Sequence, residues 1–192
     1  MGAELVFYTS NRAKYEEARS VLGARGFPVR WQRRSLVEPQ ASTLETVVRA
    51  KLRQVAAPPR GFALVEDSGL FVPSLGGFPG VYSSYVLKTL GLEGLLRALR
   101  GQRRNASFVA VVGLAGRGML RLGRGEVRGS LAPTPRGRGG FGFDPVFIPE
   151  GHSQTFAQMG SEGKALLSHR TRALRGLIRF LETSSPPPRR TG

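Results

Sequence analysis

The hydrophobic residues in the first third of the chain form short apolar runs separated by amphipathic segments. Residues 5–8 and 62–65 are nearly continuous apolar runs, which is typical of strands buried on both faces of a sheet. Residues 29–32 can form a further strand. Helical periodicity occupies residues 15–23 and the segment 42–55, which opens with the capping sequence Ser-Thr-Leu-Glu. We therefore expect an open α/β sheet, in which ligands bind beyond the carboxyl ends of strands.

The rest of the chain combines a glycine- and proline-rich loop with short helices and longer β-rich segments. Residues 107–114 and 119–131 predict an antiparallel pair, which Gly123 and Gly125 would bend or bulge and which we expect in a smaller lobe. Apolar residues at helical spacing over 166–181 predict a helix packed on the sheet. The remaining expected elements are a rigid loop at 75–80, helices near 81–89 and 92–99, and a strand at 146–148.

The length and hydrophobic content are those of a globular protein. With 192 residues, 40% of them hydrophobic, the chain can bury a core, and we expect residues 1–183 to form one domain of two lobes. Residues 184–192, SSPPPRRTG, are polar and proline-rich and predict a disordered tail. The sequence has no run of eighteen apolar residues and no basic-then-apolar leader. We therefore expect a cytoplasmic protein that does not enter a membrane.

The charge balance is strongly positive. A net charge of +16, from 29 basic and 13 acidic residues, attracts polyanions such as nucleic acid, nucleotides or an anionic membrane without choosing among them. No helix gathers a basic stripe with base-reading residues, so we expect non-specific nucleic-acid binding in vitro but no specific nucleic-acid partner.

The absence of cysteine narrows the chemistry. It excludes disulfides, thiolate nucleophiles and cysteine-based metal sites. Because the chain has only two histidines, a metal would be held by carboxylates, which favours Mg²⁺ or Mn²⁺.

Residues 9–14, Thr-Ser-Asn-Arg-Ala-Lys, connect the first predicted strand to the first predicted helix. A turn of small hydroxyl and amide side chains before a helix leaves backbone N–H groups and the positive dipole end available to an anion. Lys14, in the first turn, would add a point charge for a phosphate. The same residues also fit an ordinary N-cap by Ser10 or Asn11, and the pattern does not decide between the two interpretations.

Glu66 and Asp67 follow the apolar run 62–65, where we expect the carboxyl end of a strand and therefore the ligand crevice. Since successive strand side chains point to opposite faces, the two carboxylates are expected to have different roles. Asp67 is the candidate metal ligand or base. Glu38, in a loop, is a second metal candidate because carboxylates are scarce. The alternative is an acidic turn capped by Asp67 and a solvated Glu38.

The segment from Gly140 to Arg170 gathers aromatic rings, a carboxylate, a lysine, a histidine and an arginine. Glycines beside aromatic residues in 140–145 would let the backbone approach a flat ligand while a ring stacks on it. Lys164 and the triplet 168–170 are expected one to two turns into a final helix that starts near Ser161. Together these residues would hold a nucleobase. A surface loop leading into a basic amphipathic helix explains them equally well.

Four motifs in this order resemble one known family. They are TSNRAK at 9–14, EDSGL at 66–70 with SLGGFPGVYS at 74–83, GFGFDPVF at 140–147, and TFAQM at 155–159 followed by Lys164 and SHR at 168–170. The chain resembles the inosine triphosphate pyrophosphatases, which hydrolyse ITP, dITP and XTP to the monophosphate and pyrophosphate. The resemblance implies an α/β fold with an elongated mixed sheet flanked by helices, a cleft between two lobes, Mg²⁺ as cofactor, and a homodimer.

The resemblance also assigns roles to positions of this sequence. Asp67 becomes the general base that directs water at the α-phosphorus and, with Glu38, a Mg²⁺ ligand. Arg170 or a protonated His169 would donate to the 6-keto group of the purine, and adenine would leave a buried cation unpaired. The implied substrate-binding residues are Thr9, Ser10, Asn11, Lys14, Lys51, Ser68, Phe141, Gly142, Phe143, Asp144, Lys164, His169 and Arg170.

Two positions depart from the family pattern. Phe143 stands where Tyr or Trp is expected, which puts a hydrogen bond in doubt, and Gln158 stands where Glu is usual, which puts a salt bridge in doubt.

Two other functions stay open. One is a related nucleotide pyrophosphatase of other specificity. The other is a basic nucleic-acid-binding protein on the same fold, which predicts salt-sensitive binding without Mg²⁺-dependent hydrolysis.

Overall fold

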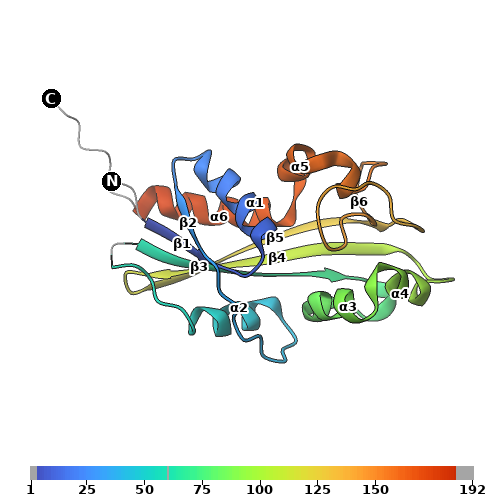
Figure 1. Cartoon of the computed structure of the whole chain (residues 1–192), viewed down its shortest axis with the longest axis horizontal. Helices are drawn as coiled ribbons and strands as arrows, with labels where there is room; N and C mark the ends of the chain where they lie inside the picture. Colours follow the sequence, from blue (N-terminus) through green and yellow to red (C-terminus); the bar gives the residue numbers. More distant parts are fainter. Residues whose placement is uncertain (1–3, 60, 185–192) are drawn as a thin grey trace.

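One six-stranded mixed sheet with the strand order β2-β1-β3-β4-β5-β6 runs through the molecule (Figure 1). The computed structural model describes residues 4–59 and 61–184. The predicted tail 184–192 lies outside the described residues except for Ser184, whose backbone is helical and not disordered. The strands are β1 Glu4–Tyr8, β2 Val29–Gln32, β3 Gly61–Phe71, β4 Asn105–Gly116, β5 Met119–Leu131 and β6 Phe147–Pro149. β1 is parallel to β2 and β3, whereas the pairs from β3 to β6 are antiparallel. The α/β class with a mixed sheet is confirmed.

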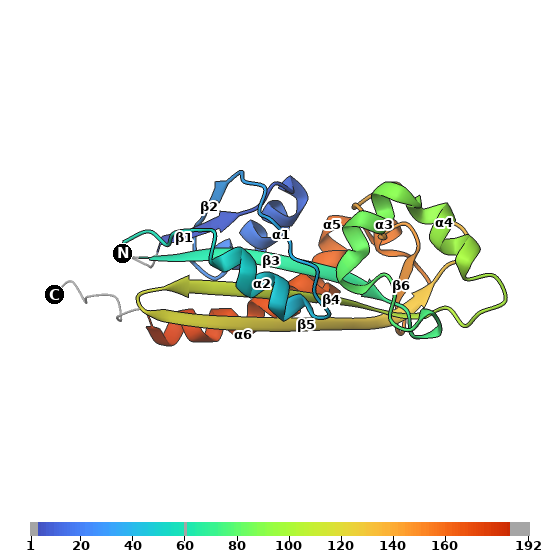
Figure 2. The same ribbon diagram turned by 90° about the horizontal axis from the view of Figure 1, so that it is seen from below.

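The long strands β3, β4 and β5 run the length of the molecule (Figure 2). β1, β2 and the helix α1 (Arg12–Gly23) lie beside one end. The helices α3 (Ser83–Thr89) and α4 (Gly91–Ala98) lie beside the other end with β6. Helix α6 (His169–Ser184) covers one face of the sheet with α1, and α2 (Leu44–Leu52) covers the opposite face (Figure 1). The other described helices are α5 (Phe156–Leu167) and two short 3₁₀ turns, η1 (Pro73–Leu75) and η2 (Gly80–Tyr82).

β3 is longer than the apolar run that predicted it. The expected end near Val65 is wrong, because antiparallel pairing with β4 continues as far as Phe71 and satisfies the backbone of the polar residues. The parallel neighbour β1 stops earlier, at the pair Phe7 with Leu64. Glu66 and Asp67 therefore lie inside a strand. Among the described residues, β4 is the only strand that pairs with residues 65–70 of β3, so the other edge of β3 has no strand beside it there.

Gly123 and Gly125 of β5 do not form the bulge that the sequence predicted. The pairing of β4 with β5 keeps one register throughout, from Asn105 opposite Ser130 to Gly116 opposite Met119, so the pair contains no bulge. The pair also lies between β3 and β6 in the one six-stranded sheet. A Cβ on Gly123 would lie 2.3 Å from the carbonyl oxygen of Ala173. Glycine therefore lets α6 lie directly on the strand.

Two helix boundaries differ from the sequence prediction. The N-cap of α2 is Thr43, whose side chain accepts from the backbone N–H of Thr46 at 3.2 Å. The predicted final helix is two helices, because Ser168 is extended (φ −61°, ψ 148°) between α5 and α6. Ser168 Oγ accepts from the backbone N–H of Thr171 at 3.1 Å, which caps α6. This break places His169 and Arg170 in the first turn of α6. Over the described ranges, the helices are too short or too polar to cross a bilayer.

Candidate functional site

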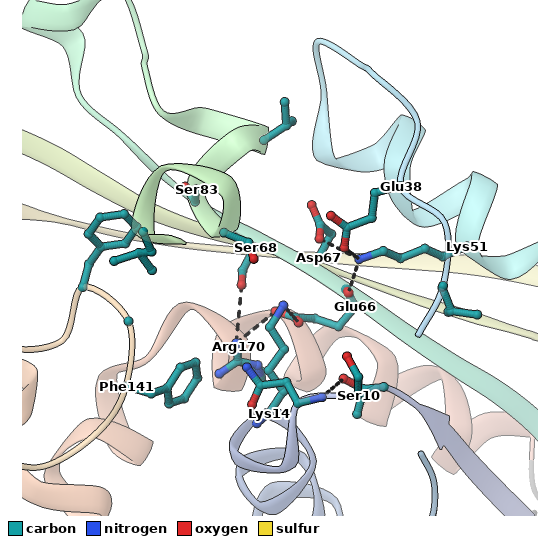
Figure 3. A pocket seen from close by; sticks show the side chains of 18 of the residues that line it. Ser10, Lys14, Glu38, Lys51, Glu66, Asp67, Ser68, Ser83, Phe141 and Arg170 are labelled. Atoms are coloured by element: carbon teal, nitrogen blue, oxygen red, sulfur yellow. Dashed lines mark hydrogen bonds and ion pairs between the residues drawn. The ribbon is translucent and has the colours of Figure 1, made fainter. Parts of the chain in front are cut away.

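A cavity of about 650 Å³ opens between the elements at the two ends of the long strands (Figure 3). This volume is within the range of pockets that enclose small molecules. All the predicted catalytic, metal and substrate residues line this one cavity, although they come from distant parts of the chain. They are Thr9, Ser10, Asn11, Lys14, Glu38, Lys51, Asp67, Ser68, Phe141, Gly142, Phe143, Asp144, Lys164, His169 and Arg170.

The turn from Thr9 to Lys14 leads from β1 into α1 at the cavity wall. Asn11 is the N-cap, and its Oδ1 accepts from the backbone N–H of Lys14 at 3.2 Å. Thr9 Oγ1 accepts from the backbone N–H of Asn11 at 3.1 Å. The turn is thus an ordinary N-cap, and it is also a helix N-terminus whose dipole favours an anion in the cavity. The two interpretations that the sequence left open are compatible.

Asp67 points from β3 toward α2, where it meets Lys51. Lys51 Nζ lies 2.7 Å from Asp67 Oδ1 and 2.7 Å from Glu38 Oε1, and it donates to the backbone carbonyl of Glu66 at 3.2 Å. Burial raises the pKa of Asp67, and the Lys51 ammonium opposes this only in part. Burial alone would lower the pKa of Lys51, but its two carboxylate partners raise it. Asp67 is therefore a buried carboxylate of raised basicity, which suits a proton acceptor.

The Glu38 and Asp67 carboxylates are the candidate metal ligands. In the part of the chain that the structure describes, no group of three or more His, Asp or Glu side chains is placed to hold a metal ion alone. Mg²⁺ needs no such cage, since it commonly takes one or two carboxylates and completes its shell with waters and substrate phosphates. Two converging carboxylates are a donor set that Mg²⁺ can use, and in this structure Lys51 Nζ lies where Glu38 and Asp67 converge.

Glu66 points to the opposite face of β3, toward α1 and α6, as the strand alternation predicted. Its carboxylate lies 2.6 Å from Lys14 Nζ and 3.1 Å from Arg170 Nη2. Arg170 also pairs with Glu17 of α1, and its Nη2 is 3.5 Å from Ser68 Oγ. Burial would raise the pKa of Glu66, but Arg170 and Lys14 hold it well below its ordinary range. Burial would likewise lower the pKa of Arg170, and Glu66 and Glu17 raise it instead. Both groups stay charged.

Lys164 connects α5 to the glycine-rich loop and to α1. Its Nζ lies 2.7 Å from Asp144 Oδ2, 2.7 Å from Glu17 Oε1 and 4.3 Å from the centre of the Phe141 ring. Asp144 Oδ2 also accepts from the backbone N–H of Phe141 at 2.7 Å. A Cβ on Gly140 would lie 2.2 Å from that oxygen, so the loop requires glycine there. These contacts fix Phe141 at the cavity wall, with a cation against its ring.

His169 is a buried residue of the cavity wall. Burial, reinforced by the neighbouring Arg170 cation, lowers its pKa well below the ordinary value. The ring stacks on Phe108, with centroids 4.6 Å apart and planes 8° apart. The lowered pKa favours the neutral imidazole, which has only one N–H to donate, over the protonated His169 that the sequence analysis named as an alternative donor to Arg170.

The two departures from the family pattern have local explanations. Phe143 is buried in a hydrophobic cluster, with its ring centroid 6.3 Å from that of Phe108, so a polar tip would have to enter the core. Gln158 completes a capping box at the start of α5, in which its Oε1 accepts from the backbone N–H of Thr155 at 3.0 Å. An amide oxygen makes this bond as a carboxylate would.

Glu17 and Phe108 are the important residues that the sequence analysis missed. Glu17 holds both Lys164 and Arg170, and Phe108 lines the cavity beneath His169. Glu17 lies one helical turn after Lys14, on the same face of α1, and this spacing was a usable signal. No local pattern singled out Phe108, because it is one of several apolar residues in the predicted strand 107–114.

Comparison with known proteins agrees with this arrangement. The model of the Ham1 family matches residues 5–180. The dITP/XTP pyrophosphatase of Thermococcus kodakarensis is 47% identical over 179 residues, covering 93% of this chain and 97% of that protein. The dITP/XTP pyrophosphatase of Hyperthermus butylicus is 45% identical over 184 residues, covering 95% of this chain and 97% of that protein.

Solved structures show the same architecture. A HAM1 protein from Coxiella burnetii has a TM-score of 0.82 at 30% identity, over 95% of this chain and all of that one. The Staphylococcus aureus Ham1 protein has a TM-score of 0.78 at 30% identity, over 93% of this chain and 98% of that one. The resemblance drawn from the four motifs is thereby confirmed, and the chain belongs to the Ham1 family.

Proposed function

We propose that this protein hydrolyses the non-canonical purine nucleoside triphosphates dITP, XTP and ITP to the nucleoside monophosphate and pyrophosphate. One observation carries the proposal: a single cavity joins the cluster of Asp67, Lys51 and Glu38 to the Phe141 ring and the Arg170 guanidinium. The first group suits a polyphosphate and the second a flat base. The relatives from Thermococcus kodakarensis and Hyperthermus butylicus, both dITP/XTP pyrophosphatases, support the same substrate class.

The part of the cavity around Lys14, Lys51 and Asp67, called the phosphate end, supplies positive charge and a general base. Lys14, Lys51 and the start of α1 would hold the triphosphate, and Asp67 would orient and deprotonate the water that attacks the α-phosphorus. Breaking the bond between the α- and β-phosphates then releases pyrophosphate. Glu38 and Asp67 would hold Mg²⁺, which when bound neutralises charge on the phosphate oxygens.

The part of the cavity around Phe141, His169 and Arg170, called the base end, would select the purine through its hydrogen-bond donors. Phe141 offers a ring for stacking, and neutral His169 and Arg170 offer N–H donors to a 6-keto oxygen. The sequence argument that adenine leaves a buried cation unpaired needs revision, because Arg170 already pairs with Glu66 and Glu17. We attribute the rejection of adenine to its 6-amino group, a donor that would face the Arg170 guanidinium, which has no acceptor to offer.

The proposed function is tested by identifying the product that the protein releases from a nucleoside triphosphate. Purified protein with dITP or XTP and Mg²⁺ should release pyrophosphate, with far slower release from dATP or dTTP and none after chelation of the metal. Release of inorganic phosphate in place of pyrophosphate would reject the proposed bond cleavage. Salt-sensitive DNA binding without any hydrolysis would favour the nucleic-acid-binding alternative.

Asp67→Asn should lower pyrophosphate release at least about 100-fold, because the amide cannot take a proton from water. Nucleotide affinity, measured by calorimetry without Mg²⁺, should change much less, since Lys51 keeps Glu38 as a partner. Glu93→Gln, on the exposed surface of α4, is the control and should keep full activity. Turnover close to wild type in Asp67→Asn would remove this residue from the mechanism.

A further inference from the structure

Most of the positive charge in the cavity wall is already neutralised by the protein itself. Each of the cations considered so far has carboxylate partners in the described residues. The pairs are Lys14 with Glu66, Lys51 with Asp67 and Glu38, Lys164 with Glu17 and Asp144, and Arg170 with Glu17 and Glu66. Five carboxylates therefore face four cations, and His169 is held neutral. In this structure the interior therefore carries no net positive charge, so Lys14 and Lys51 would have to exchange carboxylate partners for phosphate oxygens when they bind a polyphosphate.

Two further cations in the same wall are not neutralised in this way. Arg34 and Lys88 line the cavity, and both are exposed. Within residues 4–59 and 61–184, neither side chain has a carboxylate in salt-bridge range, whereas all four interior cations do. An exposed, uncompensated cation at a cavity mouth attracts an anionic ligand without first having to break an internal pair.

The two cations come from different elements of the cavity wall. Arg34 lies in the loop between β2 and α2, and its backbone N–H donates to the carbonyl oxygen of Thr9 at 3.4 Å, which ties it to the phosphate-binding turn. Lys88 lies on α3, next to Leu87, the nearest side chain to a Cβ built on Gly142. Figure 3 shows α3 and the α2 segment on either side of Asp67 and Ser68.

We infer that Arg34 and Lys88 form a cationic rim that binds the polyphosphate chain of the substrate and so selects triphosphates over monophosphates. The inference rests on the proposed function for the identity of the substrate. The quantity that it predicts is the affinity of the cavity for polyphosphate, which can be measured without hydrolysis. The rim supplies the net positive charge that the paired interior lacks. Arg34, beside the turn from Thr9 to Lys14, contacts phosphate oxygens, and Lys88 adds a point charge from α3.

The experiment measures binding of inorganic tripolyphosphate by calorimetry in the absence of Mg²⁺, so that it does not depend on turnover. Arg34→Ala and Lys88→Ala should each weaken this binding about tenfold, the loss of one charge-assisted contact. The double variant should weaken it about 100-fold if the two sites act independently. Arg34→Lys should retain most of the affinity. Binding of dIMP should change less than twofold in every variant.

Arg33→Ala is the matched control, because it removes the same charge from an exposed neighbour that does not line the cavity. It should leave tripolyphosphate binding within twofold of wild type. In dITP hydrolysis, the rim variants should raise KM and leave kcat nearly unchanged. Equal losses in Arg33→Ala and Arg34→Ala, or unchanged tripolyphosphate affinity in the double variant, would overturn the rim. Absence of hydrolysis by wild-type protein with intact rim-dependent binding would instead reject the proposed function.

Discussion

At the scale of single residues, the site is a network of buried charges arranged on the two faces of one strand. Glu66 and Asp67 are neighbours in sequence, yet one pairs with Lys14 and Arg170 and the other with Lys51. Strand alternation predicted this separation, because it depends only on local backbone geometry. The pairing of Glu17 with Arg170 was not predictable in this way, since it joins residues 153 positions apart.

Glu66→Gln should lower the free energy of unfolding by about 3 kcal/mol at pH 7, because it leaves Lys14 without its carboxylate and removes one of the two carboxylates that pair with the buried Arg170. The Glu66 carboxyl is ordinarily half-protonated near pH 4.5, and in the folded protein its pKa is lower. Below that pH the unfolded chain binds the proton and the folded chain does not, so the wild type should lose stability as the solution is acidified.

Urea denaturation between pH 7 and pH 3 checks this prediction. The difference between wild type and Glu66→Gln should shrink below about pH 4.5, by up to about 1.4 kcal/mol per pH unit. Glu93→Gln, a change at an exposed carboxylate, should follow the wild-type curve. A difference that stays constant with pH would show that the Glu66 ion pairs do not stabilise the fold.

At the scale of elements, the position of α6 on β5 decides where the base-end residues lie. The sequence predicted β4, β5 and the apolar face of α6 over 174–181 correctly, because these follow from periodicity. Leu166, which it counted on the same face, is exposed and belongs to α5. The sequence attributed Gly123 and Gly125 to a bulge, since a local pattern cannot show that a helix passes over the strand. The break between α5 and α6 was missed for a similar reason: the apolar pattern continues across Ser168, and only backbone geometry separates the helices.

Gly125→Ala should destabilise the protein by about 1–3 kcal/mol, the usual cost of overpacking. Its Cβ would lie 2.1 Å from the carbonyl oxygen of His169 and 2.4 Å from the backbone nitrogen of Ala173, and backbone atoms cannot rotate away. Because the displaced helix carries His169 and Arg170, pyrophosphate release should fall as well. Thermal denaturation and the dITP assay measure the two effects.

Gly176→Ala provides the control within the same helix. A Cβ on Gly176 meets nothing within 4 Å, so alanine should stabilise α6 by up to about 1 kcal/mol through its higher helix propensity. Activity should be unchanged. If Gly125→Ala were as stable as Gly176→Ala, the close packing of α6 on β5 would not require glycine.

At the scale of the whole molecule, the dominant feature is the net charge of +16. Composition predicted an attraction for polyanions, but it did not show that the interior cations of the cavity are paired within the described residues while Arg34 and Lys88 in the same wall are not. The family and the mixed α/β sheet were both predicted from the ordered motifs and are confirmed. The homodimer stays a prediction.

Non-specific DNA binding should follow from this charge. Fluorescence anisotropy with two unrelated duplexes should give equal affinities that fall steeply as salt rises from 50 to 200 mM, because binding releases counterions from the phosphates. Saturating duplex should leave dITP hydrolysis at high substrate concentration unchanged, since a duplex is too wide for a nucleotide-sized cavity. A clear preference for one sequence would contradict the expectation of no specific nucleic-acid partner.

The sequence by itself determined what depends on neighbouring residues: the strand and helix periods, the N-cap before Lys14, the opposite faces of Glu66 and Asp67, and the motifs that mark the family. Short-range geometry fixes these features wherever the segment is placed. Only the tertiary structure decided the neutral state of His169, the ion pairs of Glu17, the need for glycine under α6, and the contrast between paired interior cations and the free rim of Arg34 and Lys88. Burial and charge pairing arise between segments that are distant in the chain, so they exist only after the sheet has brought those segments together.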